Sequence, residues 1–108
     1  MNTLYDITVR IDGHAMVEDP KCPSRWKGSG CYDVEAPGWC LVSLYVSAET
    51  EARARYLASQ HDFDIDEFVD IDDVTVVECK STRPADEEEI GVEVYHVSPV
   101  TWREDDCL

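Results

Sequence analysis

The sequence predicts an α+β fold: a single domain with a mostly antiparallel four-stranded sheet and one main helix packed on one face. Three observations support this prediction. Four segments have the residue pattern of β-strands, one segment between the second and third has helical spacing, and 44% of the 108 residues are hydrophobic. That hydrophobic fraction suffices for one core in a chain of this length. We therefore expect residues 1–108 to fold as one domain, in the order strand, long loop, strand, helix, strand, strand.

The first predicted strand covers residues 4–12. Its apolar and polar residues alternate, as in a strand with one buried face: Tyr5, Ile7, Val9 and Ile11 on one side, and Asp6, Thr8, Arg10 and Asp12 on the other. Asp12-Gly13 is a turn signal. A short strand over residues 15–17 would end before Asp19-Pro20.

Residues 19–38 are rich in proline and glycine, and we predict a long ordered loop here. Its aromatic residues provide groups that can pack against the sheet. Its basic residues are Lys21, Arg25 and Lys27, the one concentration of positive charge in the chain. One interpretation is that the aromatics only fix the loop to the sheet. The other is a secondary partner-contact loop, because long loops often carry function; its residues would be Trp26, Tyr32 and Trp39.

The second strand, residues 40–46, is apolar on both faces, which predicts a central position in the sheet. Ser47 is the predicted N-cap of a helix that runs to about His61, with Glu49 and Glu51 in its first turn. Small residues recur at three- and four-residue spacings in this helix, which suits close packing on a sheet. A right-handed crossover would make the strands on either side of the helix parallel if they are neighbours.

The third and fourth strands are predicted at residues 74–80 and 91–98, separated by a charged turn at 86–89. Before the third strand, Asp64 to Glu67 has capping-box spacing, which favours a short helical turn over residues 65–69. After the fourth strand, residues 100–108 form a tail that packs through Trp102 or frays.

Residues 62–73, DFDIDEFVDIDD, form the most unusual segment of the chain. Seven of these twelve residues are acidic and the other five are Phe, Ile or Val. Such a segment can anchor its apolar side chains in the core and present carboxylates to solvent, which suits a cation or a positively charged partner.

The formal net charge is −15, and the acidic residues are concentrated in the second half of the chain. Residues 62–108 hold sixteen acidic residues against three basic ones. This charge disfavours direct binding to nucleic acid phosphates. No segment approaches the roughly 18–20 apolar residues of a membrane span, and we expect no membrane partner. Five cysteines without close pairs indicate reduced thiols and a cytoplasmic protein.

Metal binding is the alternative function that the sequence leaves open. Aligned to a calcium-binding loop, five acidic residues fall at ligand positions: Asp62, Asp64, Asp66, Asp70 and Asp73. However, Glu67 stands where the loop needs glycine, and Asp73 is shorter than the usual glutamate. Cysteines at Cys22, Cys31 and Cys40 lack the close pairs of a structural zinc site. We therefore expect no bound metal.

Catalytic function has no support in the sequence. The three histidines occur singly, and no glycine-rich phosphate loop precedes a helix. We therefore predict that the protein is not an enzyme and needs no cofactor.

A small, acidic, single-domain chain with one helix, a few strands and no catalytic motif resembles the inhibitor proteins of phages and mobile elements, in particular anti-CRISPR proteins and DNA mimics. The segment from Val46 to Glu78 also looks like strand–helix–strand units of small phage proteins. The resemblance implies an inhibitor in the cytoplasm of a bacterial host. Its partner would be a basic protein or a nucleoprotein complex, such as a CRISPR effector, whose nucleic-acid-binding site it occupies.

Charge and expected exposure select the residues that would bind this partner. They lie in the acidic segment and in the charged turn: Asp62, Asp64, Asp66, Glu67, Asp70, Asp72, Asp73, Asp86, Glu87, Glu88 and Glu89.

Overall fold

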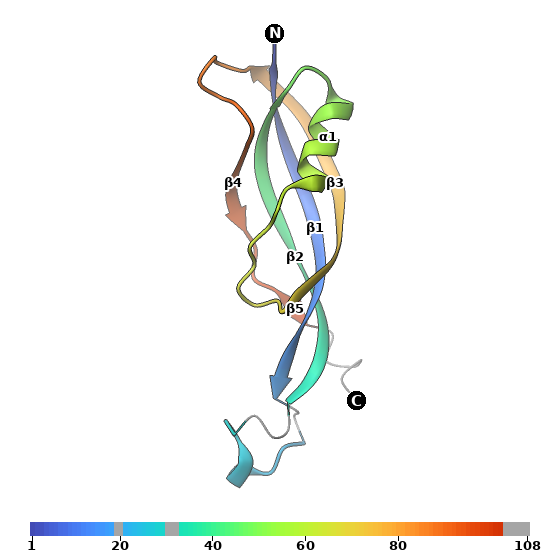
Figure 1. Ribbon diagram of the computed structural model, residues 1–108, viewed down its shortest axis with the longest axis vertical. Coiled ribbons are helices and arrows are strands. Elements are labelled where there is room, and N and C mark those ends of the chain that lie inside the picture. The colour runs from blue at the N-terminus through green and yellow to red at the C-terminus, as the bar shows by residue number, and fades with distance from the viewer. Residues whose placement is uncertain (19–20, 30–32, 103–108) are drawn as a thin grey trace.

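The computed structural model describes residues 1–18, 21–29 and 33–102, and it confirms the α+β fold (Figure 1). The elements are β1 (Thr3–Glu18), the 3-10 helix η1 (Ser24–Trp26), β2 (Asp33–Ala48), α1 (Glu51–Gln60), β3 (Asp70–Pro84), β4 (Val92–Val97) and β5 (Thr101–Trp102). The sheet has the order β3-β1-β2-β4. The short strand β5 pairs with β2 along the same edge as β4. All four strand pairings are antiparallel.

The hairpin of β1 and β2 forms the centre of the sheet, as the apolar faces of residues 40–46 predicted. Its register is continuous from Thr3↔Ala48 to Glu18↔Asp33. Strand β1 separates β2 from β3, so these two strands run parallel without being neighbours. The length of the hairpin makes the molecule a rod with extents of 61 × 22 × 17 Å.

Two sequence-based boundaries are wrong at this hairpin. The predicted turn at Asp12-Gly13 is part of β1, and residues 33–38 of the predicted loop belong to β2. The reason is that Gly13 and Gly38 are directly opposite each other in the register. Their missing side chains leave room for other groups of the protein, so these glycines serve packing and not a turn.

The core lies on the face of the sheet that α1 covers. It contains the alternating apolar residues of the strands, together with alanines of α1 and the anchors of the acidic segment: Tyr5, Ile7, Val9, Ile11, Cys40, Val42, Leu44, Val46, Ala48, Ala54, Ala58, Phe63, Ile65 and Phe68. The small side chains of Ala54 and Ala58 are fully buried, which lets the helix lie close to the sheet, as its residue spacing predicted.

Helix α1 begins later than the sequence predicted. Strand β2 continues through Ala48, and the backbone nitrogen of Ser47 donates a hydrogen bond to Gly91 O over 3.1 Å. The N-cap is therefore Thr50, whose hydroxyl accepts from the backbone nitrogen of Arg53 at 3.1 Å. None of the helices in the described ranges is long and apolar enough to cross a membrane.

Strand β3 is longer than predicted and forms one edge of the sheet. Its register against β1 shifts three times, so that Asp72, Val77 and Thr82 are extra residues without an opposite partner. Before β3, the predicted helical turn is reduced to one hydrogen bond, from the backbone nitrogen of Phe68 to Ile65 O at 3.0 Å.

The space opposite Gly13 and Gly38 is filled by two aromatic rings. A Cβ atom at Gly13 would lie 2.8 Å from the Phe68 ring, and one at Gly38 would lie 2.7 Å from the Trp102 ring. The two rings contact each other edge to face, with centroids 5.8 Å apart. Trp102 thus holds the end of the described chain against the sheet, which corresponds to the first of the two alternatives stated for the tail; residues 103–108 lie outside the described residues.

Candidate protein-interaction surface

The acidic segment has the arrangement that its alternating residues predict. Phe63, Ile65 and Phe68 are 8%, 7% and 9% exposed and belong to the core. The acidic side chains between them face solvent: Asp62, Asp64, Asp66 and Glu67. We name these four residues the carboxylate row. Because each carboxylate is next to a buried side chain, the row is held by the core.

Backbone contacts fix the segment further. The nitrogen of Val69 donates to His14 O at 2.9 Å, which ties the end of the segment to β1. At its beginning, the Phe63 ring packs edge to face on His61, with centroids 4.8 Å apart. These contacts lower the conformational freedom that the row would lose on binding.

Within the described residues, no member of the carboxylate row has an ion-pair partner. A hollow of about 280 Å³ lies beside the row, lined by Asp62, Asp64, Asp70 and the apolar residues Phe63, Ile65, Phe68, Val69 and Ile71. The carboxylates at this hollow suit the charged end of a lysine or arginine side chain.

Asp70 and Asp72 lie at the start of β3, where they surround His14, and Asp70 also lines the hollow beside the carboxylate row. Asp72 Oδ2 is 3.1 Å from His14 Nδ1, and Asp70 Oδ2 is 3.5 Å from Nε2. Glu35 Oε1 of β2 approaches the same Nε2 to 3.6 Å. The hydrogen bond to Asp72 is the main cause that raises the pKa of His14, with added attraction from Asp72, Glu35 and Asp70. These acids therefore have an internal partner.

This histidine makes the stability of the fold depend on pH. A pKa that is raised in the folded state stabilises the fold fully below the ordinary value of 6.5, and this stabilisation is lost as pH rises through the folded value. We expect the difference in urea midpoint between the wild type and His14→Gln to be positive at acidic pH and to shrink toward alkaline pH. Asp72→Asn should reduce this pH dependence. Parallel urea curves of wild type and His14→Gln across the pH range would contradict the prediction.

Asp73 acts locally. Its carboxylate accepts from its neighbour Val74 N at 3.0 Å and from the Thr75 hydroxyl at 3.4 Å. It remains exposed at the edge of the sheet.

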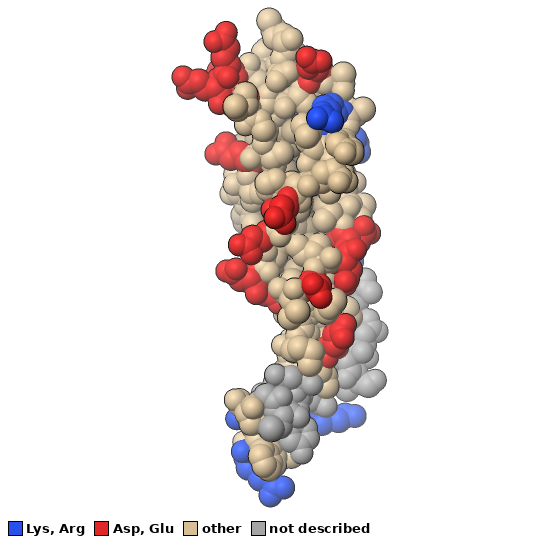
Figure 2. Space-filling view, in the orientation of Figure 1, with Lys and Arg blue, Asp and Glu red and all other residues tan. Residues whose placement is uncertain are grey.

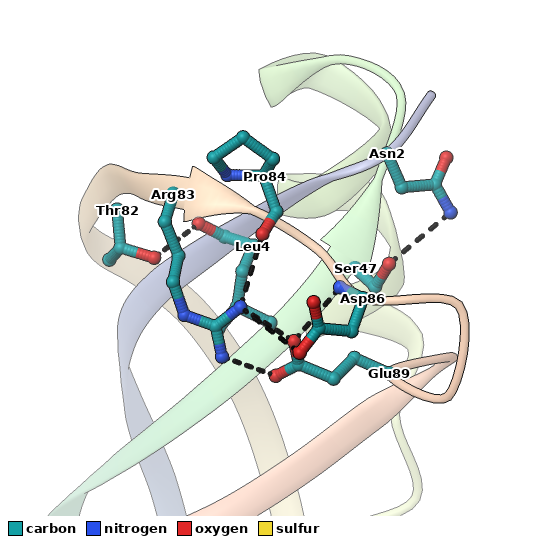
Figure 3. A network of polar contacts seen from close by, with 8 residues as sticks. All are labelled: Asn2, Leu4, Ser47, Thr82, Arg83, Pro84, Asp86 and Glu89. Atoms are coloured by element: carbon teal, nitrogen blue, oxygen red, sulfur yellow. Dashed lines mark hydrogen bonds and ion pairs between the residues drawn. The ribbon is translucent and has the colours of Figure 1, made fainter.

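The charged turn at 86–89 is organised by Arg83 (Figure 3). The guanidinium donates two hydrogen bonds to the Glu89 carboxylate, at 2.7 and 2.8 Å. The Glu89 carboxylate also accepts from the backbone nitrogen of Asp86 at 3.0 Å. Arg83 is the main cause that lowers the pKa of Glu89. Glu89 is therefore a structural residue, while Asp86, Glu87 and Glu88 carry the exposed charge of this turn.

The structure does not bring all predicted acidic residues into one patch. Figure 2 shows acidic side chains spread along the body of the rod. The two ends of β3, Pro84 and Asp70, pair with Thr3 and His14 of β1, and eleven strand residues at about 3.3 Å each place these ends about 36 Å apart. The turn at 86–89 is thus separate from the carboxylate row and from the group around His14, whereas Asp70 lies in both of the latter surroundings.

The predicted aromatic loop is also divided. Trp26 lies in η1 and is 41% exposed. Trp39 lies within β2, with the Arg10 guanidinium 4.7 Å from its ring centroid. Six residues separate Trp39 from the start of β2, or about 20 Å of strand. Tyr32 lies outside the described residues.

Neither metal-binding alternative, the calcium loop or the cysteine zinc site, has a cluster of ligands within the described residues. No group of three or more His, Cys, Asp or Glu side chains there could hold a metal ion. Cys40 is fully buried in the core, and burial raises the pKa of its thiol. Burial also raises the pKa of Cys79. Cys31 and Cys107 lie outside the described residues.

Sequence reasoning missed His14 and Arg83 as partners of the acidic residues. The signal for Arg83 was available, because it is the last basic residue before the acidic turn. His14 is 58 residues from Asp72 and meets it only through the β1–β3 pairing. Comparison of the chain with protein-family models, with curated proteins and with solved structures finds no match in any of the three.

Proposed function

We propose that this protein is a non-enzymatic inhibitor that uses its carboxylate row to occupy a basic, nucleic-acid-binding site of a partner. The observation that carries the proposal is the alternation of buried Phe63, Ile65 and Phe68 with exposed acids that have no ion-pair partner in the described parts of the chain. Carboxylates fixed by a core can match a basic surface with little loss of freedom.

The chemical class of the partner follows from this surface. A basic site that evolved to bind phosphates offers lysine and arginine side chains, which the hollow beside the row accommodates. Such a partner is a basic protein or a nucleoprotein complex, for example a CRISPR effector in a bacterial cytoplasm. The net charge of −15 favours fast, salt-sensitive association with it and disfavours binding of nucleic acid to the chain itself.

The proposal predicts that neutralising the carboxylate row weakens partner binding without affecting the fold. The test variant replaces Asp62, Asp64 and Asp66 by Asn and Glu67 by Gln. Each immobilised variant is used to capture proteins from a bacterial lysate, and the captured nucleic-acid-binding complexes are quantified with and without added duplex DNA. We expect about tenfold less capture than for the wild type, since several rim charges are lost together.

The matched control removes four exposed charges elsewhere, at Glu49, Glu51, Glu78 and Glu93, all changed to Gln. It should retain capture, duplex DNA should compete with the captured complexes, and labelled duplex DNA alone should not bind the protein. Equal capture by the two four-charge variants, or capture that DNA does not reduce, would contradict the proposed function.

A further inference from the structure

We propose that copies of this protein associate head to tail: the basic tip of one copy docks in an acidic groove at the opposite end of the next copy. The basic tip comprises residues 21–29, which include Arg25, Trp26 and Lys27. The acidic groove has a volume of about 580 Å³ and is lined by Met1, Asn2, Pro84, Ala85, Asp86, Glu87, Glu89 and Ile90.

The basic tip lies beyond the main body of the sheet. The last residue of β1 that pairs with β3 is His14, and the hairpin continues for four further pairs, about 13 Å. Hydrogen bonds order the end of the tip, from Trp26 N to Pro23 O at 2.9 Å and from Ser29 N to Trp26 O at 3.1 Å. The tip is therefore accessible from several sides.

The chemistry of the tip suits an acidic and partly apolar partner. Residues 21–29 contain three basic residues and no acidic one, although acidic residues flank them on both sides in the sequence. The Arg25 guanidinium lies 5.8 Å from the Trp26 ring centroid, and the indole is 41% exposed. Exposed tryptophan and arginine side chains are the residue types that contribute most at protein interfaces.

The acidic groove has the complementary chemistry. Met1 and Ile90 are exposed by 103% and 82%, so an apolar surface is available at this end of the rod. The Asp86 side chain is 79% exposed. Two contacts hold the groove in shape: the Arg83–Glu89 pair, and a hydrogen bond from Ala85 N to Asn2 O at 2.9 Å. Apolar side chains rimmed by carboxylates fit an indole flanked by basic residues.

The positions of the two surfaces favour a second copy as the occupant. They lie at opposite ends of a rod that is 61 Å long, so one copy cannot close the contact on itself (Figures 1 and 2). Head-to-tail contact also keeps the acidic bodies displaced along the rod, and charges farther apart than the Debye length of about 8 Å are largely screened. Such a heterologous contact is open-ended. The carboxylate row takes no part in it and stays free for the proposed inhibitor function.

Sedimentation velocity on the full chain tests the contact. At about 0.15 M salt, where the Debye length is about 8 Å, we expect the average mass to rise with protein concentration to about twofold or more above the 12.3 kDa of one chain, and to fall again at about 1 M salt. Two charge reversals should each abolish the rise: Arg25→Glu with Lys27→Glu at the tip, and Asp86→Lys with Glu87→Lys at the groove. A reversal of equal size on α1, Arg53→Glu with Arg55→Glu, should leave it unchanged.

Mixing the two variants distinguishes specific contact between tip and groove from a general effect of net charge on association. A mixture of the tip variant and the groove variant should associate again, because each end then meets a surface of opposite charge. A single chain that carries all four reversals should also associate. A wild type that stays monomeric, or a mixture that does not associate, would overturn the inference. Because every variant keeps the carboxylate row, a failure here is independent of the lysate experiment.

Discussion

Replacing Phe68 by alanine should lower the free energy of unfolding by about 3–5 kcal/mol, the usual cost of removing a buried aromatic ring. Phe68 is 9% exposed, packs over Gly13 and contacts Trp102. Gly13 has no side chain beneath the ring, so removal of the ring leaves a cavity at this position. Urea unfolding followed by tryptophan fluorescence measures the loss.

The matched control is the neighbouring residue. Val69 is 66% exposed, so Val69→Ala should change the free energy of unfolding by less than about 0.5 kcal/mol. If the two substitutions have equal cost, Phe68 is not an anchor of the acidic segment. A folded Phe68→Ala protein should also capture less partner than the wild type, because the carboxylate row loses its support.

Replacing Gly38 by alanine should destabilise the protein by about 1–3 kcal/mol through overpacking. The sign of this stability change is informative, because replacing glycine by alanine in an open strand position usually stabilises a protein. Here a Cβ atom would lie 2.7 Å from the Trp102 ring and 3.0 Å from Val100 Cγ1, so the ring must move. Thermal and urea unfolding of Gly38→Ala measure the effect.

A double-mutant cycle with Trp102→Ala assigns the cause. Once the ring is absent, the added methyl group has space, and the cost of Gly38→Ala should fall to below about 1 kcal/mol. Additive costs of the two substitutions would show that Gly38 is required for its backbone and not for the ring.

The parts of the fold that could be predicted from sequence depend on neighbouring residues alone. The alternation in residues 4–12 predicted the buried face of β1, which is confirmed because a side chain in an extended chain points opposite to its neighbour, whatever the sheet order. In the acidic segment the expectation holds for Phe63, Ile65 and Phe68, but Val69 is exposed.

The parts that could not be predicted depend on residues distant in sequence. Gly13 has the local signature of a turn, but within the strand it leaves room for the backbone oxygen of Asp70 and the ring of Phe68, which are both distant in sequence. Likewise, the sequence treats Asp70 and Glu89 as equivalent members of an acidic surface. The structure gives them different partners, His14 and Arg83, and places them at different ends of β3.

The three irregularities of β3 have a consequence for the concentrated protein. A regular edge strand of fifteen residues would be a template for sheet growth and fibril formation. Asp72, Val77 and Thr82 interrupt this template at intervals of five residues, so no long row of backbone amides is aligned to accept another strand. These interruptions work against lateral growth of the sheet along this edge.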